Sequence, residues 1–127
     1  MEWERYIEEG IAAIPERYRE KIRNVAILLE DEPSKAVRRE QGLVYGETLL
    51  GLYQGVPLPE RGDTYGIGVT LPDTITIYTR ATLEEAKETD GDVARIVRET
   101  IWHEFGHYFG LDEGEVRARE VERGYGT

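Results

Sequence analysis

The sequence is organised around the stretch His103-Glu104-Phe105-Gly106-His107-Tyr108-Phe109-Gly110-Leu111-Asp112-Glu113. Residues four positions apart lie on one face of a helix, so His103 and His107 can reach the same ion. Glu104 projects to the side of that ion, where it can accept a proton from a water bound to it. The spacing therefore predicts a zinc site with its own base on a helix.

The residues after the second histidine predict a helix end and a third ligand. Gly110 tolerates the positive φ with which a helix stops and the chain turns. Glu113 can then complete the protein side of a tetrahedral site and leave the fourth position to water. Asp112 is the alternative third ligand, although the spacing favours Glu113. The full pattern is H-E-x-x-H-x-x-G-x-x-E.

Composition limits both the metal ligands and the partners of this protein. The chain has no cysteine, which excludes disulfides and thiolate ligands, and its only two histidines both belong to the motif. The formal net charge of −10 argues against binding to nucleic acid, because contacts to a phosphate backbone need clustered Lys and Arg. A length of 127 residues suits one core, so we predict a single domain over residues 1–127.

Neither a secretion signal nor a membrane span is visible in the sequence. The first residues are acidic and lack the basic segment and apolar core of a signal peptide. No apolar run approaches the roughly 18 residues that a membrane span needs. We therefore predict a cytoplasmic protein with no membrane partner.

Hydrophobic periodicity predicts a mixture of helices and strands. The expected helices cover about 2–13, 15–22, 82–88, 92–109 and 112–123, and the expected strands cover about 24–31, 49–53 and 74–80. The strand at 24–31 is a nearly continuous apolar run, so we expect it at the centre of the sheet. Thr82 with Glu85, and Asp112 with Glu115, form capping patterns at the starts of their helices. The glycine-broken residues 65–71 fit either an edge strand or a loop.

The longest expected helix carries the metal ligands at the far end of its core-facing side. With about 100° per residue, one arc contains Val93, Ile96, Val97, Thr100, His103, Glu104 and His107, and the opposite arc contains Arg95, Arg98, Glu99 and Gly106. We therefore expect the ion where this helix leaves the core and meets a cleft in front of the sheet.

These residues resemble the small bacterial zincin-like metallopeptidases, which are also described as minimal zincins. The likeness covers residues 49–62, 72–78 and 103–113. It implies an α+β fold with a small mixed sheet, N-terminal helices and a long active-site helix. Metzincins share the spacing but have a third histidine and a methionine turn. Here the third position is Glu113 and the only methionine is Met1, so no such turn is expected.

The resemblance also implies an activity and a role for each motif residue. His103, His107 and Glu113 would bind Zn²⁺, and Glu104 would act as general base. The reaction would be hydrolysis of peptide bonds in a peptide or protein substrate by a zinc-bound water. Tyr78, Tyr108 and Arg61 have the chemistry of an oxyanion donor, but packing is the simpler role for each.

The substrate is expected to bind in extended form along an edge strand, either 74–80 or 65–71. A non-catalytic metal-binding or interaction domain on the same fold is the alternative function. An RNA hydrolase is a third possibility, which the glutamate after the first histidine and the negative charge oppose. The sequence does not indicate an oligomeric state.

Overall fold

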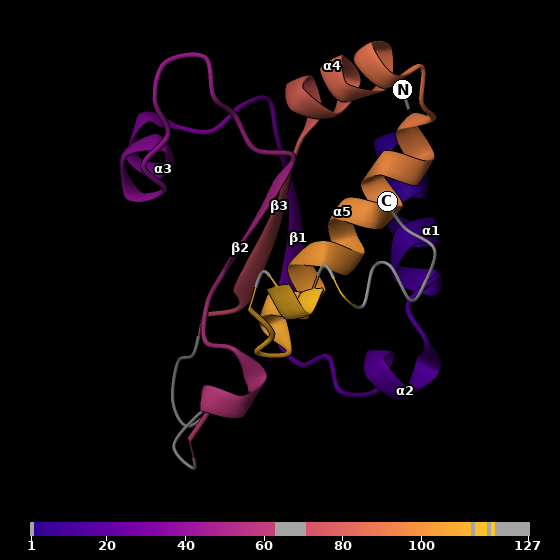
Figure 1. The fold of residues 1–127 in the computed structure, drawn as a ribbon. Helices are drawn as coiled ribbons and strands as arrows, with labels where there is room; N and C mark the ends of the chain where they lie inside the picture. The colour runs from indigo at the N-terminus through magenta and orange to yellow at the C-terminus, as the bar shows by residue number, and fades with distance from the viewer. Residues whose placement is uncertain (1, 63–70, 113, 117, 119–127) are drawn as a thin grey trace.

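The fold is α+β, as predicted, with a small sheet covered on one face by a long helix (Figure 1). A computed structural model describes residues 2–62, 71–112, 114–116 and 118. In chain order the elements are α1 (Trp3–Ala12), α2 (Glu16–Arg19), β1 (Val25–Glu30), α3 (Lys35–Glu40), β2 (Gly51–Gln54), the 3-10 helix η1 (Leu58–Glu60), β3 (Asp73–Tyr78), α4 (Thr79–Thr89) and α5 (Val93–Tyr108).

The sheet has the strand order β1-β3-β2. Strand β1 pairs with β3 in parallel, and β2 pairs with β3 in the antiparallel sense. The prediction that residues 24–31 lie at the centre is wrong, because β3 is central and β1 lies at an edge of the described sheet. Leu28 and Leu29 are 42% and 40% exposed, so the second half of the apolar run of β1 faces outward. An apolar run alone does not distinguish a central strand from an edge strand.

Helix α5 lies between the sheet and α1, and both of these contact it (Figure 1). Its N-cap is Asp92, whose carboxylate accepts a hydrogen bond from the Ala94 backbone N–H. The main core cluster consists of Ile14, Ile75, Ile77, Val97, Ile101, Phe105 and Tyr108. Because α1 covers a second side of α5, Ile101 is also buried although it lies outside the predicted apolar stripe, and Gly106 is buried against Val116.

The helix that follows β3 begins earlier than predicted. Helix α4 starts at Thr79, directly after the strand, and Thr82 lies inside it. The Thr82 hydroxyl donates to the Tyr78 carbonyl oxygen at 2.8 Å, so this residue bonds back along the helix and does not cap it. Within the described part of the chain, no helix has the length and apolar character that a bilayer crossing requires.

Candidate metal centre and cleft

Three side chains with metal-binding chemistry come together near the C-terminal end of α5. Each of His103, Glu104 and His107 offers one donor atom, and these atoms all lie within 4.8 Å of one another. The two imidazole rings have their centres 5.2 Å apart. Glu104 is buried and the histidines are half-buried. Two nitrogens and a carboxylate oxygen at this separation can hold a metal ion, and such a donor set suits zinc.

The helix ends as the sequence predicts. Gly110 has a φ of +88°, the N–H of Gly110 donates to the His107 carbonyl, and the N–H of Leu111 donates to the Gly106 carbonyl. These bonds form a Schellman motif, in which a residue with positive φ closes the helix. The chain therefore reverses directly after the second histidine.

This turn also orients the second histidine. The Nδ1 atom of His107 lies 3.0 Å from the Leu111 carbonyl oxygen. A carbonyl oxygen only accepts hydrogen bonds, so Nδ1 carries the hydrogen and Nε2 keeps the lone pair that a metal would use. The hydrogen bond fixes both the tautomer and the direction of the ring.

The residues considered for the third ligand lie just beyond the turn. Glu113 falls outside the described residues. The Asp112 carboxylate accepts a hydrogen bond from the Glu115 N–H at 2.9 Å, and the Glu115 carboxylate accepts one from the Asp112 N–H at 3.3 Å. This is the predicted reciprocal cap, and it engages one carboxylate oxygen of Asp112. The predicted extent of the last helix to about residue 123 lies mostly outside the described residues.

The Glu104 carboxylate joins α5 to the edge strand β2. Its Oε1 atom accepts a hydrogen bond from the Tyr53 backbone N–H at 2.9 Å, and its Oε2 atom lies 4.0 Å from His103 Nε2. One oxygen is thus held by the strand and the other faces the histidines.

Gly51 allows β2 to approach α5 closely. A Cβ atom at this position would lie 2.6 Å from Thr100 Cγ2 and 3.5 Å from Glu104 Cγ. Sequence reasoning placed Gly51 in a strand but gave it no role. The available signal was a glycine within a strand, which often marks the close approach of another chain segment.

A cleft of about 840 Å³ lies in front of the three side chains, between β2 and α5. Its lining consists of Gln41, Thr48, Leu49, Leu50, Gly51, Leu52, Tyr53, Ile96, Glu99, Thr100, His103, Glu104 and His107. The cleft therefore follows β2. The prediction that residues 74–80 offer a substrate-binding edge is wrong, because β3 is paired with a strand on each side. Most of the other expected edge, 65–71, lies outside the described residues.

Of the three residues considered as oxyanion donors, Arg61 and Tyr108 have structural partners and Tyr78 is buried. Arg61 pairs with Asp73, and the Tyr108 hydroxyl bonds to backbone atoms of residues 21 and 23. Tyr78 is buried, and its burial, followed by the nearby Glu30 and Glu104 carboxylates, raises the pKa of its phenol. None of these three is among the residues that line the cleft.

The fold and the site together define a class of small α+β domains in which one long helix presents two histidines and a glutamate to a cleft beside an edge strand. A family model described as zincin-like metallopeptidase matches residues 22–123. The match covers most of the chain, and the chain belongs to this family. A search of curated proteins finds no match.

Proposed function

We propose that this protein is a zinc-dependent metallopeptidase that hydrolyses peptide bonds with Glu104 as general base. The observation that carries the proposal is the position of His103, Glu104 and His107 at one cleft beside an edge strand. Membership of the zincin-like metallopeptidase family supports the same activity. We propose Glu113 as the third protein ligand, on the spacing of the motif.

The residues of the site fit zinc because they offer nitrogen and oxygen donors and the chain has no cysteine. Zinc, when bound, supplies Lewis acidity that polarises the scissile carbonyl and lowers the pKa of water to about 7. The Glu104 carboxylate then accepts the proton of the attacking water and passes it to the leaving nitrogen. Its Oε2 atom is the oxygen for this task, because Oε1 already accepts the Tyr53 N–H.

The substrate would lie along β2 as an additional antiparallel or parallel strand. The backbone groups of a strand alternate in direction, and the Tyr53 N–H points away from β3 toward Glu104. The N–H and C=O of Gly51, two residues earlier, face the same outer edge. These groups can pair with the backbone of an extended peptide in the cleft, and such pairing would favour unfolded segments as substrates.

The test combines metal content with cleavage of an unbiased peptide library. By mass spectrometry we expect stoichiometric zinc in the wild type and in Glu104→Gln, and loss of zinc in His103→Ala. Cleavage by Glu104→Gln should fall by at least about 100-fold, the usual contribution of a general base. The exposed Glu8 on α1 gives the control, since Glu8→Gln removes the same charge outside the motif and the cleft lining.

The outcomes separate the peptidase from its alternative. A wild type that holds zinc but cleaves nothing in the library would favour the non-catalytic metal-binding domain. Full cleavage by Glu104→Gln would contradict the role of this glutamate, and a wild type without zinc would contradict the metal site itself.

A further inference from the structure

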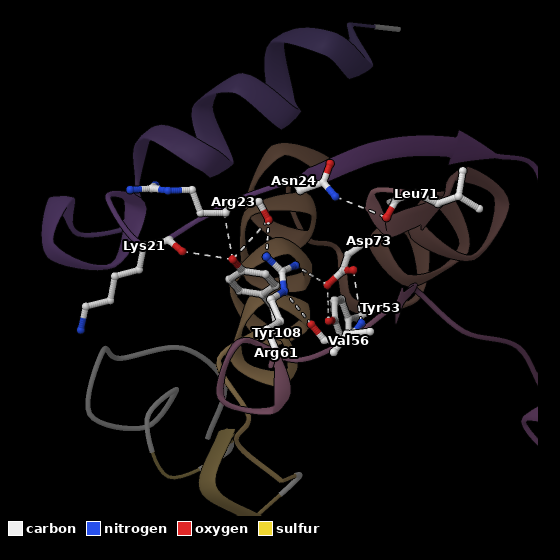
Figure 2. A network of polar contacts seen from close by, with 9 residues as sticks. All are labelled: Lys21, Arg23, Asn24, Tyr53, Val56, Arg61, Leu71, Asp73 and Tyr108. Carbon is white, nitrogen blue, oxygen red and sulfur yellow. Dashed lines mark hydrogen bonds and ion pairs between the residues drawn. The ribbon is translucent and has the colours of Figure 1, made fainter. Parts of the chain in front are cut away.

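A buried polar network lies beside the candidate site and centres on the Asp73 carboxylate at the start of β3 (Figure 2). Asp73 Oδ2 accepts hydrogen bonds from the Tyr53 hydroxyl at 2.6 Å and from Arg61 Nη2 at 2.7 Å. Its Oδ1 atom accepts the Val56 N–H at 3.2 Å. The Asp73 side chain is only 3% exposed, so this charge depends on its three donors.

Arg61 extends the network to the start of β1 and to α5 (Figure 2). Its side chain is 6% exposed and donates to the carbonyl oxygens of Arg23 at 2.8 Å and Val56 at 3.0 Å. The guanidinium carbon lies 5.0 Å from the centre of the Tyr108 ring. The Tyr108 hydroxyl in turn accepts the Arg23 N–H at 2.8 Å. The network thus joins four chain segments around the end of α5 that carries the histidines.

Tyr53 is the residue at which this network meets the candidate site. Its hydroxyl donates to Asp73, its ring packs edge-on against Tyr108 with centres 6.1 Å apart, and its backbone N–H donates to Glu104. Burial, followed by the hydrogen bond to Asp73, raises the pKa of Tyr53 well above its usual range. The raised pKa keeps the phenol protonated, so its hydroxyl remains the donor to Asp73.

We infer that Tyr53 is a positioning residue for Glu104. The Asp73–Arg61 ion pair holds the Tyr53 side chain, and the restrained residue holds Glu104 Oε1 through its backbone N–H. In the described sheet β2 has a neighbouring strand on one side only, so no further strand holds the outward N–H of Tyr53. This inference rests on the proposed role of Glu104 as general base.

Backbone amide hydrogen exchange tests whether the Tyr53 hydroxyl restrains the Tyr53 amide, and this test does not require activity. The variant is Tyr53→Phe, which keeps the ring and removes the hydroxyl, in the zinc-loaded protein. We expect exchange at the residue 53 amide to accelerate about fivefold, which corresponds to the roughly 1 kcal/mol of one hydrogen bond. The neighbouring Leu52 amide points toward β3 and should change by less than about twofold. Tyr6→Phe, on α1, is the matched control and should change neither rate.

Two results would overturn the inference. Unchanged exchange at residue 53 would show that the hydroxyl does not restrain this amide. Equal acceleration at Leu52 would show that the hydroxyl stabilises β2 as a whole and has no specific positioning role. If Tyr53→Phe does not fold, Glu104→Ala removes the acceptor from the other side and should accelerate exchange at Tyr53 in the same way.

Turnover of a peptide selected from the library tests whether the restraint at Tyr53 affects catalysis by Glu104. We expect Tyr53→Phe to lower kcat about fivefold, with KM and zinc content unchanged, because the base is misdirected while the substrate edge and the ligands remain. Accelerated exchange with an unchanged kcat would overturn the link to catalysis. A wild type that cleaves no peptide would contradict the proposed function, and the exchange measurement would still decide whether Tyr53 positions Glu104.

Discussion

Replacement of Arg61 by methionine should destabilise the protein strongly, because it leaves a buried carboxylate without its cation. The Arg61 and Asp73 side chains are 6% and 3% exposed and their charged atoms are 2.7 Å apart. Removal of one partner of a buried ion pair costs about 3–5 kcal/mol, since the remaining charge stays desolvated. Two hydrogen bonds from Arg61 to backbone carbonyls are lost as well. We therefore expect Arg61→Met to lower the free energy of unfolding by about 3–5 kcal/mol.

Arg80 supplies a matched control with the same chemistry at the surface. Its guanidinium lies 2.8 Å from Asp31 and 2.7 Å from Glu32, but the three side chains are between 55% and 68% exposed. Exposed ion pairs contribute about 0–1 kcal/mol each. Arg80→Met should therefore cost no more than about 1–2 kcal/mol, although it breaks two ion pairs of similar length.

The assay is urea unfolding followed by circular dichroism, with a chelator present so that metal binding does not add to the stability of either variant. The expected losses, about 3–5 kcal/mol for Arg61→Met and at most about 1–2 kcal/mol for Arg80→Met, differ by at least about 1 kcal/mol, and a comparison of unfolding midpoints at equal m value resolves that difference. If Arg61→Met were no more destabilising than Arg80→Met, burial of the Asp73–Arg61 pair would not govern its contribution, and the reasoning would fail.

Three further substitutions test local features of the fold by the same unfolding assay. Gly51→Ala should lower the free energy of unfolding by about 1–3 kcal/mol, because the new Cβ would lie 2.6 Å from Thr100 Cγ2. A loss below about 0.5 kcal/mol would contradict the close packing of β2 on α5. Gly110→Ala should lower the free energy of unfolding more than Gly42→Ala does. Both glycines have positive φ, but of the two only Gly110 has a neighbour, Pro59, within 4 Å of the added Cβ. Equal losses of stability would show that backbone strain acts alone. Asp92→Ala should cost about 1 kcal/mol through loss of the α5 N-cap, and an unchanged midpoint would refute the cap.

The parts of the structure that the sequence predicted well depend on neighbours in the chain. The spacing of His103 and His107 places both on one face of α5, and the stop at Gly110 is set by residues within a few positions. Helical periodicity and capping chemistry are local, so they can be read without knowledge of the fold. The long helix follows from the same kind of signal, whereas the α+β class is implied by the resemblance to small zincin-like metallopeptidases.

The arrangement of the strands and the support of the site could not be predicted in this way. Which strand is central depends on pairing between distant segments, and the alternating pattern of residues 74–80 fits an edge strand as well as the buried β3. The role of Tyr53 depends on Asp73 and Arg61, which approach it only in the folded chain. No periodicity marks such contacts. The assignment of Glu113 as a ligand remains a prediction from spacing.

The parallel pairing of β1 with β3 has a consequence for when the proposed zinc ion would bind. This pairing joins residue 25 to residue 73, and the Tyr108 hydroxyl bonds to Lys21, 87 positions earlier. Contacts between such distant segments slow folding to roughly milliseconds or longer, because large loops must close first. On an isolated α5, His103 and His107 would lack both the cleft and the hydrogen bond that holds Glu104 to Tyr53 of β2. If zinc is the cofactor, as proposed, we expect it to enter a chain that has already folded, so that its supply would affect activity and not the speed of folding.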